Sequence, residues 1–317
     1  MRHIITLKEQ TREDIIDMLR IAKKIKAKKA LGEPTNYLPD KTLIMLFQKT
    51  STRTRLSFEA AMTELGGHAI FLDSRTTQFS LTDFGLEIRA VMLFGDVLMF
   101  RAKKASDVLQ AASYDMIPVI DACSEKYHPA QALSDVMTMD EHSGGIGNVK
   151  KIVWLGIENN VSNTLTMACA KLGIEVVIAA PEVDKKSVDK ELNKQAEETG
   201  MVYRTLDLEE ALKGADFVHT DTWMNMEFFD AGKVKPEYKA EYDRRVKTFK
   251  PFHLSAELID EYAPKARVMH CMPCHVGYEI SRTAVEHPNS IIFPQAENRL
   301  HMQKAMIMWL LDKKVPL

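Results

Sequence analysis

The sequence predicts an α/β protein built from two three-layer α/β/α domains with parallel sheets, joined by interdomain helices. Three observations support this prediction. Short apolar segments alternate with helical patterns along the chain. The spacing of strand, helix and strand is typical of parallel strands connected by right-handed crossovers. The length of 317 residues exceeds one ordinary hydrophobic core and suits two domains.

The first half of the chain contains four apolar segments that predict buried strands, at 42–47, 68–72, 96–100 and 116–120. Between the first two lies a segment in which Phe58, Met62 and Leu65 recur at helical spacing, closed by two glycines. This pattern indicates an amphipathic helix. The basic run at 23–29 is typical of the solvated side of an N-terminal helix.

A second alternating series follows the glycine-rich segment 142–148, which we interpret as the boundary between the domains. Its strands are predicted at 151–156, 175–181, 201–205, 216–221 and 267–272, with helices between them. We therefore expect a first domain at 1–141 and a second at 142–297. The apolar C-terminal helix, 298–317, is expected to pack back on the first domain.

Composition argues against several classes of function. The net charge is −2 and no long block carries one sign, so neither nucleic acid nor a membrane is expected as a partner. The first residues lack the apolar core of a signal peptide, and no later segment has 18 consecutive apolar residues. The four cysteines are sparse, which fits a reducing compartment. We expect a cytoplasmic protein.

The segment HCMPCH at 270–275 contains two cysteines and two histidines. C-x-x-C-H is the pattern that attaches c-type haem, and C-x-x-C also suits zinc or dithiol chemistry. Haem of this type is attached outside the cytoplasm. A structural zinc ion needs four tetrahedral ligands, which two adjacent pairs on one short turn do not supply. The sequence therefore predicts no metal and no cofactor, with a redox or haem protein kept as an alternative.

An anion-binding site is predicted where the strand 42–47 ends and the next helix begins. Three hydroxyl residues and two arginines gather there: Ser51, Thr52, Arg53, Thr54 and Arg55. Free backbone N–H groups at a helix N-terminus bind anions, and guanidinium groups add charge-assisted hydrogen bonds. A capped surface helix is the alternative. The chain has no P-loop and no glycine-rich loop after a strand, so P-loop and hydride chemistry are not expected.

Other polar residues follow predicted strands in the same way. Arg101 ends the strand at 96–100, and His128 and Gln131 follow the strand at 116–120 by one loop. Asp221 ends the strand at 216–221. Because open α/β sheets bind ligands at the carboxyl ends of their strands, this shared location predicts that these side chains belong to a binding site.

Five segments occur in a characteristic order: FQKTSTRTR, HPAQ, DTW, HCMP and QAENRLHMQKA. Together they resemble the aspartate/ornithine carbamoyltransferase family, most closely its ornithine branch, over essentially the whole chain. The resemblance implies transfer of the carbamoyl group from carbamoyl phosphate to the side-chain amine of L-ornithine, which gives L-citrulline and phosphate. It also implies a place in arginine metabolism, no cofactor, and a homotrimer or an assembly of trimers.

The same resemblance implies roles for individual residues. Carbamoyl phosphate would be bound by Ser51, Thr52, Arg53, Thr54, Arg101, His128, Gln131, Cys271, Met272 and Arg299. Ornithine would be bound by Asn160, Asp221, Asn225 and Met226, and catalysis would use Arg101, His128, Asp221 and Cys271. These roles agree with the chemistry, which must neutralise a leaving phosphate, polarise a carbonyl oxygen and present an uncharged amine.

The resemblance weakens on the amine side. Residues 225–227 read Asn-Met-Glu where the ornithine branch usually has Ser-Met-Gly, and Glu158 stands where an arginine is usual. The added acids would suit a cationic acceptor or be solvated loop residues, so putrescine and an acylated ornithine stay as alternatives. In the loop that would reach a neighbouring subunit, Arg75 or Gln78 would serve. Cys274 matches no functional position and is expected to be a packing residue.

Overall fold

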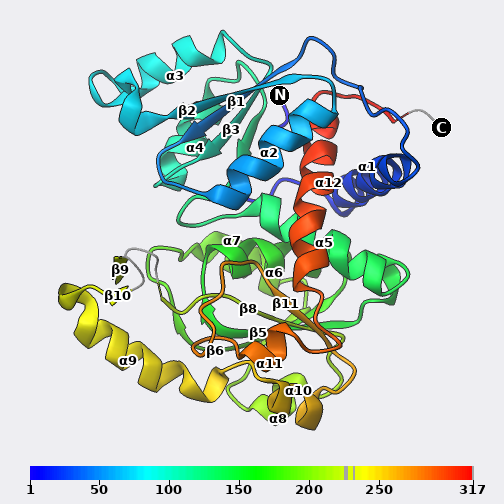
Figure 1. Ribbon diagram of the computed structural model, residues 1–317, viewed down its shortest axis with the longest axis vertical. Helices are drawn as coiled ribbons and strands as arrows, with labels where there is room; N and C mark the ends of the chain where they lie inside the picture. Colours follow the sequence, from blue (N-terminus) through cyan, green and yellow to red (C-terminus); the bar gives the residue numbers. More distant parts are fainter. Residues whose placement is uncertain (225–227, 231–232, 316–317) are drawn as a thin grey trace. The chain divides into compact units, whose positions relative to one another are not determined.

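A computed structural model describes residues 1–224, 228–230 and 233–315, apart from the side chain of Ser80. The chain divides into two compact units. Unit 1 consists of Met1–Met137, Asn163–Ala168 and Glu297–Leu317, and unit 2 consists of Thr138–Ser162 and Cys169–Ala296. Each unit has its own parallel sheet with helices around it (Figure 1), which confirms the predicted fold class.

The sheet of unit 1 has four strands in the order β2-β1-β3-β4, and every neighbouring pair is parallel. The strands are β1 (Thr42–Phe47), β2 (His68–Asp73), β3 (Val97–Arg101) and β4 (Val119–Asp121). All four were predicted, but β4 is short because Pro118, just before it, has no N–H to give to the sheet. Phe47 pairs with Arg101, so the carboxyl ends of β1 and β3 lie side by side.

The helices of this part of the chain are α1 (Arg12–Ala30), α2 (Thr52–Glu64), α3 (Phe84–Met92), α4 (Ala105–Ser113) and α5 (Pro129–His142). Helix α1 begins with a capping box in which Thr11 and Asp14 satisfy each other's backbone N–H groups. The sequence predicts α1 from its basic run and α2 from its apolar spacing, and it misses α3, α4 and α5. The proline at the first position of α5 is a typical helix-start signal that could have predicted it.

Helix α12 (Ile292–Leu310) begins six residues before the predicted helix at 298, and from Glu297 onward its residues belong to unit 1. Lys26 of α1 donates to the side chain of Asn298 at 2.7 Å, and the buried Lys304 forms an ion pair with the half-buried Glu64 of α2. These contacts join α12 to α1 and α2. Among the residues that the structure describes, no helix combines the length and the apolar character needed to cross a membrane.

The sheet of unit 2 has five parallel strands in the order β11-β8-β5-β6-β7. They are β5 (Lys151–Glu158), β6 (Glu175–Val183), β7 (Val202–Arg204), β8 (Phe217–Thr220) and β11 (Arg267–His270). All five were predicted, although β8 and β11 end before Asp221 and Cys271. In β11 the apolar pattern runs on past the strand, but Met272 has a φ of 56° and Pro273 has no N–H.

The remaining elements are α6 (Asn160–Leu172), α7 (Lys190–Glu197), α8 (Leu208–Leu212), α9 (Lys239–Phe249), α10 (Ala256–Tyr262), α11 (Arg282–Val285) and the antiparallel pair β9 (Phe229–Asp230) and β10 (Lys233–Val234). Short 3₁₀ helices lie at Ser74–Thr76, Gln78–Ser80, Ile146–Asn148, Pro236–Tyr238 and Lys250–Phe252. Gly156, at an irregularity in β5, has a φ of 107°, and a Cβ there would lie 2.7 Å from Trp223 Nε1. This position therefore requires glycine.

Candidate active site

The first turn of α2 forms the predicted anion-binding segment of unit 1. Ser51 is the N-cap residue, and its hydroxyl accepts the N–H of Thr54 at 3.4 Å. Helix α2 starts five residues after β1 ends, so its free N–H groups lie at the carboxyl edge of the sheet. The unsatisfied N–H groups and the helix dipole make this end of α2 favourable for negative charge.

Two arginines from distant parts of the sequence meet at this turn. Thr54 is fully buried, and its hydroxyl oxygen accepts from Arg299 Nη2 at 3.0 Å and from Arg101 Nη1 at 3.5 Å. Arg101 Nη1 also donates to the carbonyl of Ala122 at 3.4 Å. Arg101 ends β3 and Arg299 lies in α12, so the structure brings both predicted guanidinium groups to the first turn of α2.

His128 lies in the same unit, one residue before α5, and is 6% exposed. Burial lowers the pKa of its imidazole well below the usual 6.5, and the positive charges of Arg299, Arg101 and Lys49 lower it further. The imidazole is therefore neutral near pH 7 and can donate from one ring nitrogen without carrying charge. The sequence analysis did not single out Lys49, although it lies in the segment FQKTSTRTR, two residues before Ser51.

The buried polar atoms near this turn that have no hydrogen-bond partner within the described part of the chain include Arg101 Nε, His128 Nδ1 and Gln131 Oε1. The amide group of Gln131 is held in place, because its Nε2 donates to Asp135 at 2.8 Å. Buried polar groups in proteins are nearly always paired. These unsatisfied donors and the unsatisfied acceptor lie beside two guanidinium groups. Together they suit a ligand that has both anionic oxygens and an amide group.

Asp121 is a further member of this site that the sequence analysis missed. It is the last residue of β4, is completely buried, and accepts the N–H of Cys123 at 2.8 Å. Burial raises the pKa of its carboxyl to about 7, although the hydrogen bonds from Ser124 and Cys123 and the charge of Lys49 act in the opposite direction. The signal in the sequence was an acidic residue at the end of a buried strand.

We call the first turn of α2 together with Arg101, Arg299, His128 and Gln131 the anion cradle. The outer side of this turn faces a cavity of about 850 Å³, which Ser51, Thr52 and Arg55 help to line. Thr52 is exposed, Arg53 is half-buried, and Arg55 stacks over Phe71 at 3.8 Å, so Arg55 is directed away from Thr54. The side chain of Arg75 also lines the cavity and forms an ion pair with Asp73 that holds the pKa of this carboxyl at about 2.

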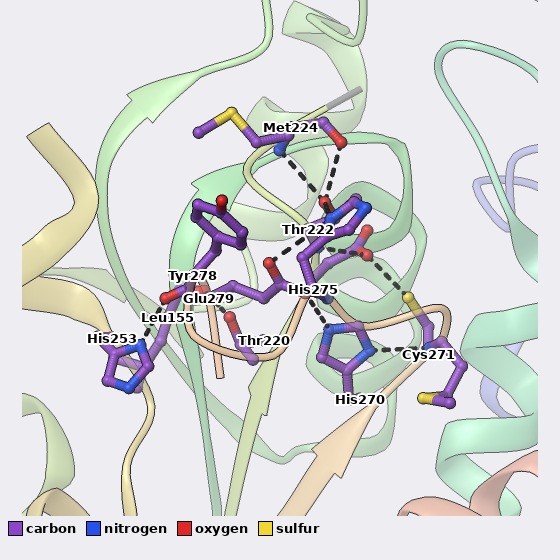
Figure 2. A network of polar contacts seen from close by, with 12 residues as sticks. Leu155, Thr220, Thr222, Met224, His253, His270, Cys271, His275, Tyr278 and Glu279 are labelled. Carbon is purple, nitrogen blue, oxygen red and sulfur yellow. Dashed lines mark hydrogen bonds and ion pairs between the residues drawn. The ribbon is translucent and has the colours of Figure 1, made fainter. Parts of the chain in front are cut away.

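In unit 2, the structure brings together the two residues predicted to face the amine. Thr220 pairs with His270, so Asp221 and Cys271 follow adjacent strand ends. Cys271 Sγ lies 3.0 Å from Asp221 Oδ1, and Asp221 Oδ2 accepts from Asn159 Nδ2 at 2.7 Å. Figure 2 shows Cys271 beside His270, with its thiol directed into this network. The backbone N–H of Thr222 also donates to Asp221 Oδ1 at 2.7 Å, so the carboxylate is held by three donors and is 7% exposed.

Two other predicted residues of unit 2 flank this pair. Asn160 is the first residue of α6 and is half-buried, directly after the N-cap Asn159. Met272 follows Cys271 and donates its backbone N–H to His270 Nδ1 at 2.8 Å. The predictions for Asn225 and Met226 fall outside the described residues.

Glu158 has a different role from the two that the sequence left open. It is 7% exposed, and its carboxylate accepts from Arg204 Nε at 3.2 Å and Nη2 at 3.1 Å. A buried carboxylate is stable when a cation pairs with it, and Arg204 supplies that cation from the end of β7. The acid is therefore neither a solvated loop residue nor an unpaired charge available to an acceptor amine.

Asp221, His270 and Cys271 have potential metal-ligand atoms within 4.8 Å of one another. Both ring nitrogens of His270 are engaged, however, Nδ1 by the N–H of Met272 and Nε2 by Glu279 at 3.2 Å. A metal ion would have to displace one of these hydrogen bonds. Cys271 and Cys274 are both reduced, with no disulfide to another described residue, and Cys274 packs against the apolar core of unit 2.

A parallel α/β unit that offers a helix N-terminus, two guanidinium groups and a neutral imidazole to an anion defines a class of enzymes acting on phosphate-bearing substrates. The family matches make the class specific. The carbamoyl-phosphate-binding domain of the aspartate/ornithine carbamoyltransferases matches residues 2–141, and their Asp/Orn-binding domain matches residues 148–310. The chain belongs to the aspartate/ornithine carbamoyltransferase family, as its sequence motifs predicted.

Relatives of known name cover the whole chain. The ornithine carbamoyltransferase of Archaeoglobus fulgidus is 36% identical over 316 residues, 99% of each chain. The anabolic ornithine carbamoyltransferase of Pyrococcus furiosus is 39% identical over 311 residues, 96% of this chain and 95% of the relative. The crystal structure of an ornithine carbamoyltransferase from Pyrococcus furiosus matches 99% of this chain and 98% of its own, with a TM-score of 0.88 and 37% identity.

Proposed function

We propose that this protein is an ornithine carbamoyltransferase, which transfers the carbamoyl group of carbamoyl phosphate to the side-chain amine of L-ornithine. The observation that carries the proposal is the buried cluster of Thr54, Arg101, Arg299 and His128 at the N-terminus of α2. The names of the full-length relatives support ornithine as the acceptor. Glu158 gives no reason to prefer another amine, because Arg204 already neutralises it.

The residues of unit 1 suit the carbamoyl phosphate half of the reaction. The leaving phosphate would be bound by the first turn of α2 and by the guanidinium groups, with contributions from Ser51, Thr52, Arg53, Thr54, Arg101 and Arg299. The neutral imidazole of His128 would donate to the carbonyl oxygen as negative charge develops on it. The unpaired Oε1 of Gln131 would accept from the carbamoyl amide. Fixed donors of this kind stabilise the transition state more than the substrate.

The residues of unit 2 suit the amine half. Asp221 would bind the ammonium group of ornithine and assist its loss of a proton, with Cys271 beside it, while Asn160, Asn225 and Met226 would bind the amino-acid end. Cys271 and Met272 would also contact the carbamoyl group. The neutral amine nitrogen attacks the carbonyl carbon, the bond from carbon to the phosphate oxygen breaks, and a proton leaves the nitrogen. The products are citrulline and phosphate, and no cofactor is needed.

The proposal extends to the domains. Residues 1–141, with the C-terminal helix 298–317, would form the carbamoyl phosphate domain, and residues 142–297 would bind the amino acid. The ranges that match the two family domains support this division. The name of the Pyrococcus furiosus relative supports a biosynthetic step in arginine metabolism, and the free cysteines fit the cytoplasm.

We also propose a homotrimer, or an assembly of trimers. Large apolar side chains on α2 and α3 and directly after α3 are more than half exposed, and exposed apolar surface commonly marks an interface. They are Leu56, Leu86, Leu93 and Phe94. The cavity beside Ser51 and Thr52 could receive Gln78 or Arg75 of a neighbouring copy. Light scattering on the purified protein measures the assembly, and a monomer at working concentration would contradict it.

A turnover assay tests the proposed activity. The purified protein would be incubated with carbamoyl phosphate and, in parallel, with ornithine, putrescine or acetylornithine, and both the carbamoylated product and phosphate would be measured. We expect product from ornithine in equal amount to phosphate, and far less from the other two amines. Faster turnover of putrescine or acetylornithine would reassign the acceptor, and phosphate release without any carbamoylated amine would reject the transferase.

A further inference from the structure

Glu279 is a buried carboxylate that belongs to none of the roles described above. It lies eight residues beyond Cys271, after the HCMPCH segment has turned back, and its side chain has no exposed surface. Figure 2 shows it between His270 and His275, at the centre of the contacts around Cys271. Burying a carboxylate is unfavourable unless it is hydrogen-bonded, so its position calls for a structural reason.

The first contact of Glu279 fixes the ring of His270. The imidazole accepts the N–H of Met272 at Nδ1, so the ring proton must be on Nε2. Nε2 therefore donates to Glu279 Oε1, at 3.2 Å. The carboxylate sets this tautomer and orientation, and through the ring it holds the backbone on the far side of Cys271. That backbone needs support, because Met272 has a φ of 56°, in the left-handed region that side chains other than glycine disfavour.

The second contact of Glu279 fixes the other end of the segment. Its Oε1 also accepts the backbone N–H of His275. The ring of His275 then reaches the loop that carries Asp221, because its Nδ1 lies 2.7 Å from Thr222 Oγ1. The hydroxyl of Thr222 donates its proton to the carbonyl of Met224, at 2.9 Å, so in its contact with His275 it must accept and the imidazole must donate. His275 therefore connects the two loops that follow β11 and β8.

We propose that Glu279 is the positioning residue that sets Cys271 against Asp221. The sheet ladder ends at the pair of Thr220 and His270, and beyond it the two loops are joined by side chains. Glu279 holds the segment 270–275 at both ends, so the thiol keeps its 3.0 Å distance from the carboxylate. It touches no substrate and acts through His270 and His275. The change in kcat that we expect on removing Glu279 rests on the proposed function, whereas the expected change in the alkylation rate of Cys271 does not.

Alkylation of Cys271 by iodoacetamide measures this positioning directly. In the folded protein the thiol of Cys271 is only partly exposed and donates to the carboxylate of Asp221, so Cys271 should react slowly. In a Cys274→Ala background, Glu279→Ala should speed its alkylation by about tenfold, since the segment is released from Asp221. Glu279→Gln should stay within about threefold of the parent, because its amide oxygen still accepts from both donors. Peptide mass spectrometry assigns the modified cysteine.

Two comparisons separate positioning from a general loss of stability. Cys169 is completely buried, so its alkylation reports unfolding and should stay at the parent level in every variant. Glu286→Gln removes a carboxylate from the same part of the chain, where the side chain is 66% exposed and pairs with Arg282, and should change nothing. Equal increases at Cys169 and Cys271 in Glu279→Ala, or no increase beyond that of Glu286→Gln, would overturn the proposal.

The kinetic test uses the same variants. Glu279→Ala should lower kcat for citrulline formation by about ten- to a hundredfold, the range that a small displacement of reacting groups produces. KM for carbamoyl phosphate should rise by a smaller factor than kcat falls, because in the proposed function its phosphate is bound by residues of unit 1 and only its carbamoyl group contacts the released segment. An equal loss in KM and kcat would reject a local effect. A wild-type protein that forms no citrulline would reject the proposed function and leave the alkylation result to decide the positioning.

Glu279→Ala could fail to fold, and Thr222→Val then decides the question. Valine keeps the shape of threonine and removes the hydroxyl that receives His275 Nδ1, together with the two local hydrogen bonds of that hydroxyl to the backbone of Met224. Alkylation of Cys271 should rise by about threefold, with Cys169 unchanged. No increase would mean that the connection from Glu279 through His275 does not hold the thiol, and the proposal would fail.

Discussion

The anion cradle of unit 1 and the thiol–carboxylate pair of unit 2 are organised in opposite ways. In the cradle, Arg101, His128 and Gln131 each have a buried polar atom that no described residue satisfies. In unit 2, Asp221 and Cys271 are already hydrogen-bonded to each other and to neighbours. The first arrangement leaves its bonding capacity for a ligand, and the second uses it to fix geometry. Mutations should therefore affect binding in the first region and the chemical step in the second.

The largest effect is expected for Arg101→Ala. It removes a half-buried cation from the site of the leaving phosphate, so kcat/KM should fall by about 10²–10³, as for the loss of one preorganised donor to developing charge. The affinity for carbamoyl phosphate, measured by calorimetry, should fall by about tenfold or more, since a hydrogen bond to a charged group contributes about 1.5–3 kcal/mol.

Arg20→Ala is the matched control for this variant. The side chain of Arg20 lies on α1, is 70% exposed and pairs only with its neighbour on the helix, Asp17, among the described contacts. It should leave both kinetics and affinity unchanged. If Arg101→Ala bound carbamoyl phosphate as well as Arg20→Ala does, the cradle would not be the anion site and the contrast between the regions would disappear.

Asp221→Asn should show the opposite pattern. Asparagine keeps the shape of the side chain but does not help remove a proton from the ammonium group, so kcat should fall by about 10². Carbamoyl phosphate affinity should stay within about twofold. Steady-state kinetics with ornithine and calorimetry with carbamoyl phosphate measure the two quantities separately. A fall in carbamoyl phosphate affinity as large as the fall in kcat would contradict the assignment of binding to unit 1 and of the chemical step to unit 2.

Glu158→Gln tests whether an acid beside the amine region serves structure rather than specificity. It removes the negative charge and one of the two oxygens that accept from Arg204, and we expect the free energy of unfolding to fall by about 1–2 kcal/mol. KM for ornithine should stay within about twofold. Glu197→Gln removes the other, 50% exposed partner of the same arginine and should change stability by about 0.5 kcal/mol at most. A marked rise in KM for ornithine in Glu158→Gln would return Glu158 to the acceptor site.

The smallest effect is expected from Asp121→Asn. Because burial raises the pKa of Asp121 from 3.8 to about 7, the folded state binds its proton more tightly than the unfolded state. The stability that this proton confers is complete below about pH 4 and is lost as the pH rises to about 7. Asparagine cannot lose a proton and still accepts from Cys123. The variant should therefore gain in Tm over the wild type as the pH rises from about 5 to about 8.

Thermal unfolding of both proteins at the two pH values measures this gain. Lys49 is the described cation that acts on Asp121, so Lys49→Met should increase the pH dependence of the wild type by removing an attraction that favours the charged carboxylate. A Tm difference between Asp121→Asn and wild type that is the same at both pH values would mean that Asp121 does not titrate in this range.

The sequence by itself determined the fold class, the nine main strands and the segments that carry the family motifs. These features depend on neighbours along the chain: apolar periodicity, helix caps and the residue that follows each strand. It did not predict α3, α4 or α5, and of their residues it singled out only Gln131, as a polar position after His128. It also placed the ends of β8 and β11 too late, since the apolar pattern continues where the backbone leaves the sheet.

The tertiary structure alone decided which side chains meet. Arg299 is 245 positions from Thr54, Arg204 is 46 positions from Glu158, and Asp221 is 50 positions from Cys271. No local pattern specifies such pairs, because the free energy of a buried charge depends on the partners that folding brings to it. For the same reason Glu279 looks like an ordinary loop acid in the sequence, and its contacts with His270 and His275 emerge only in the folded chain.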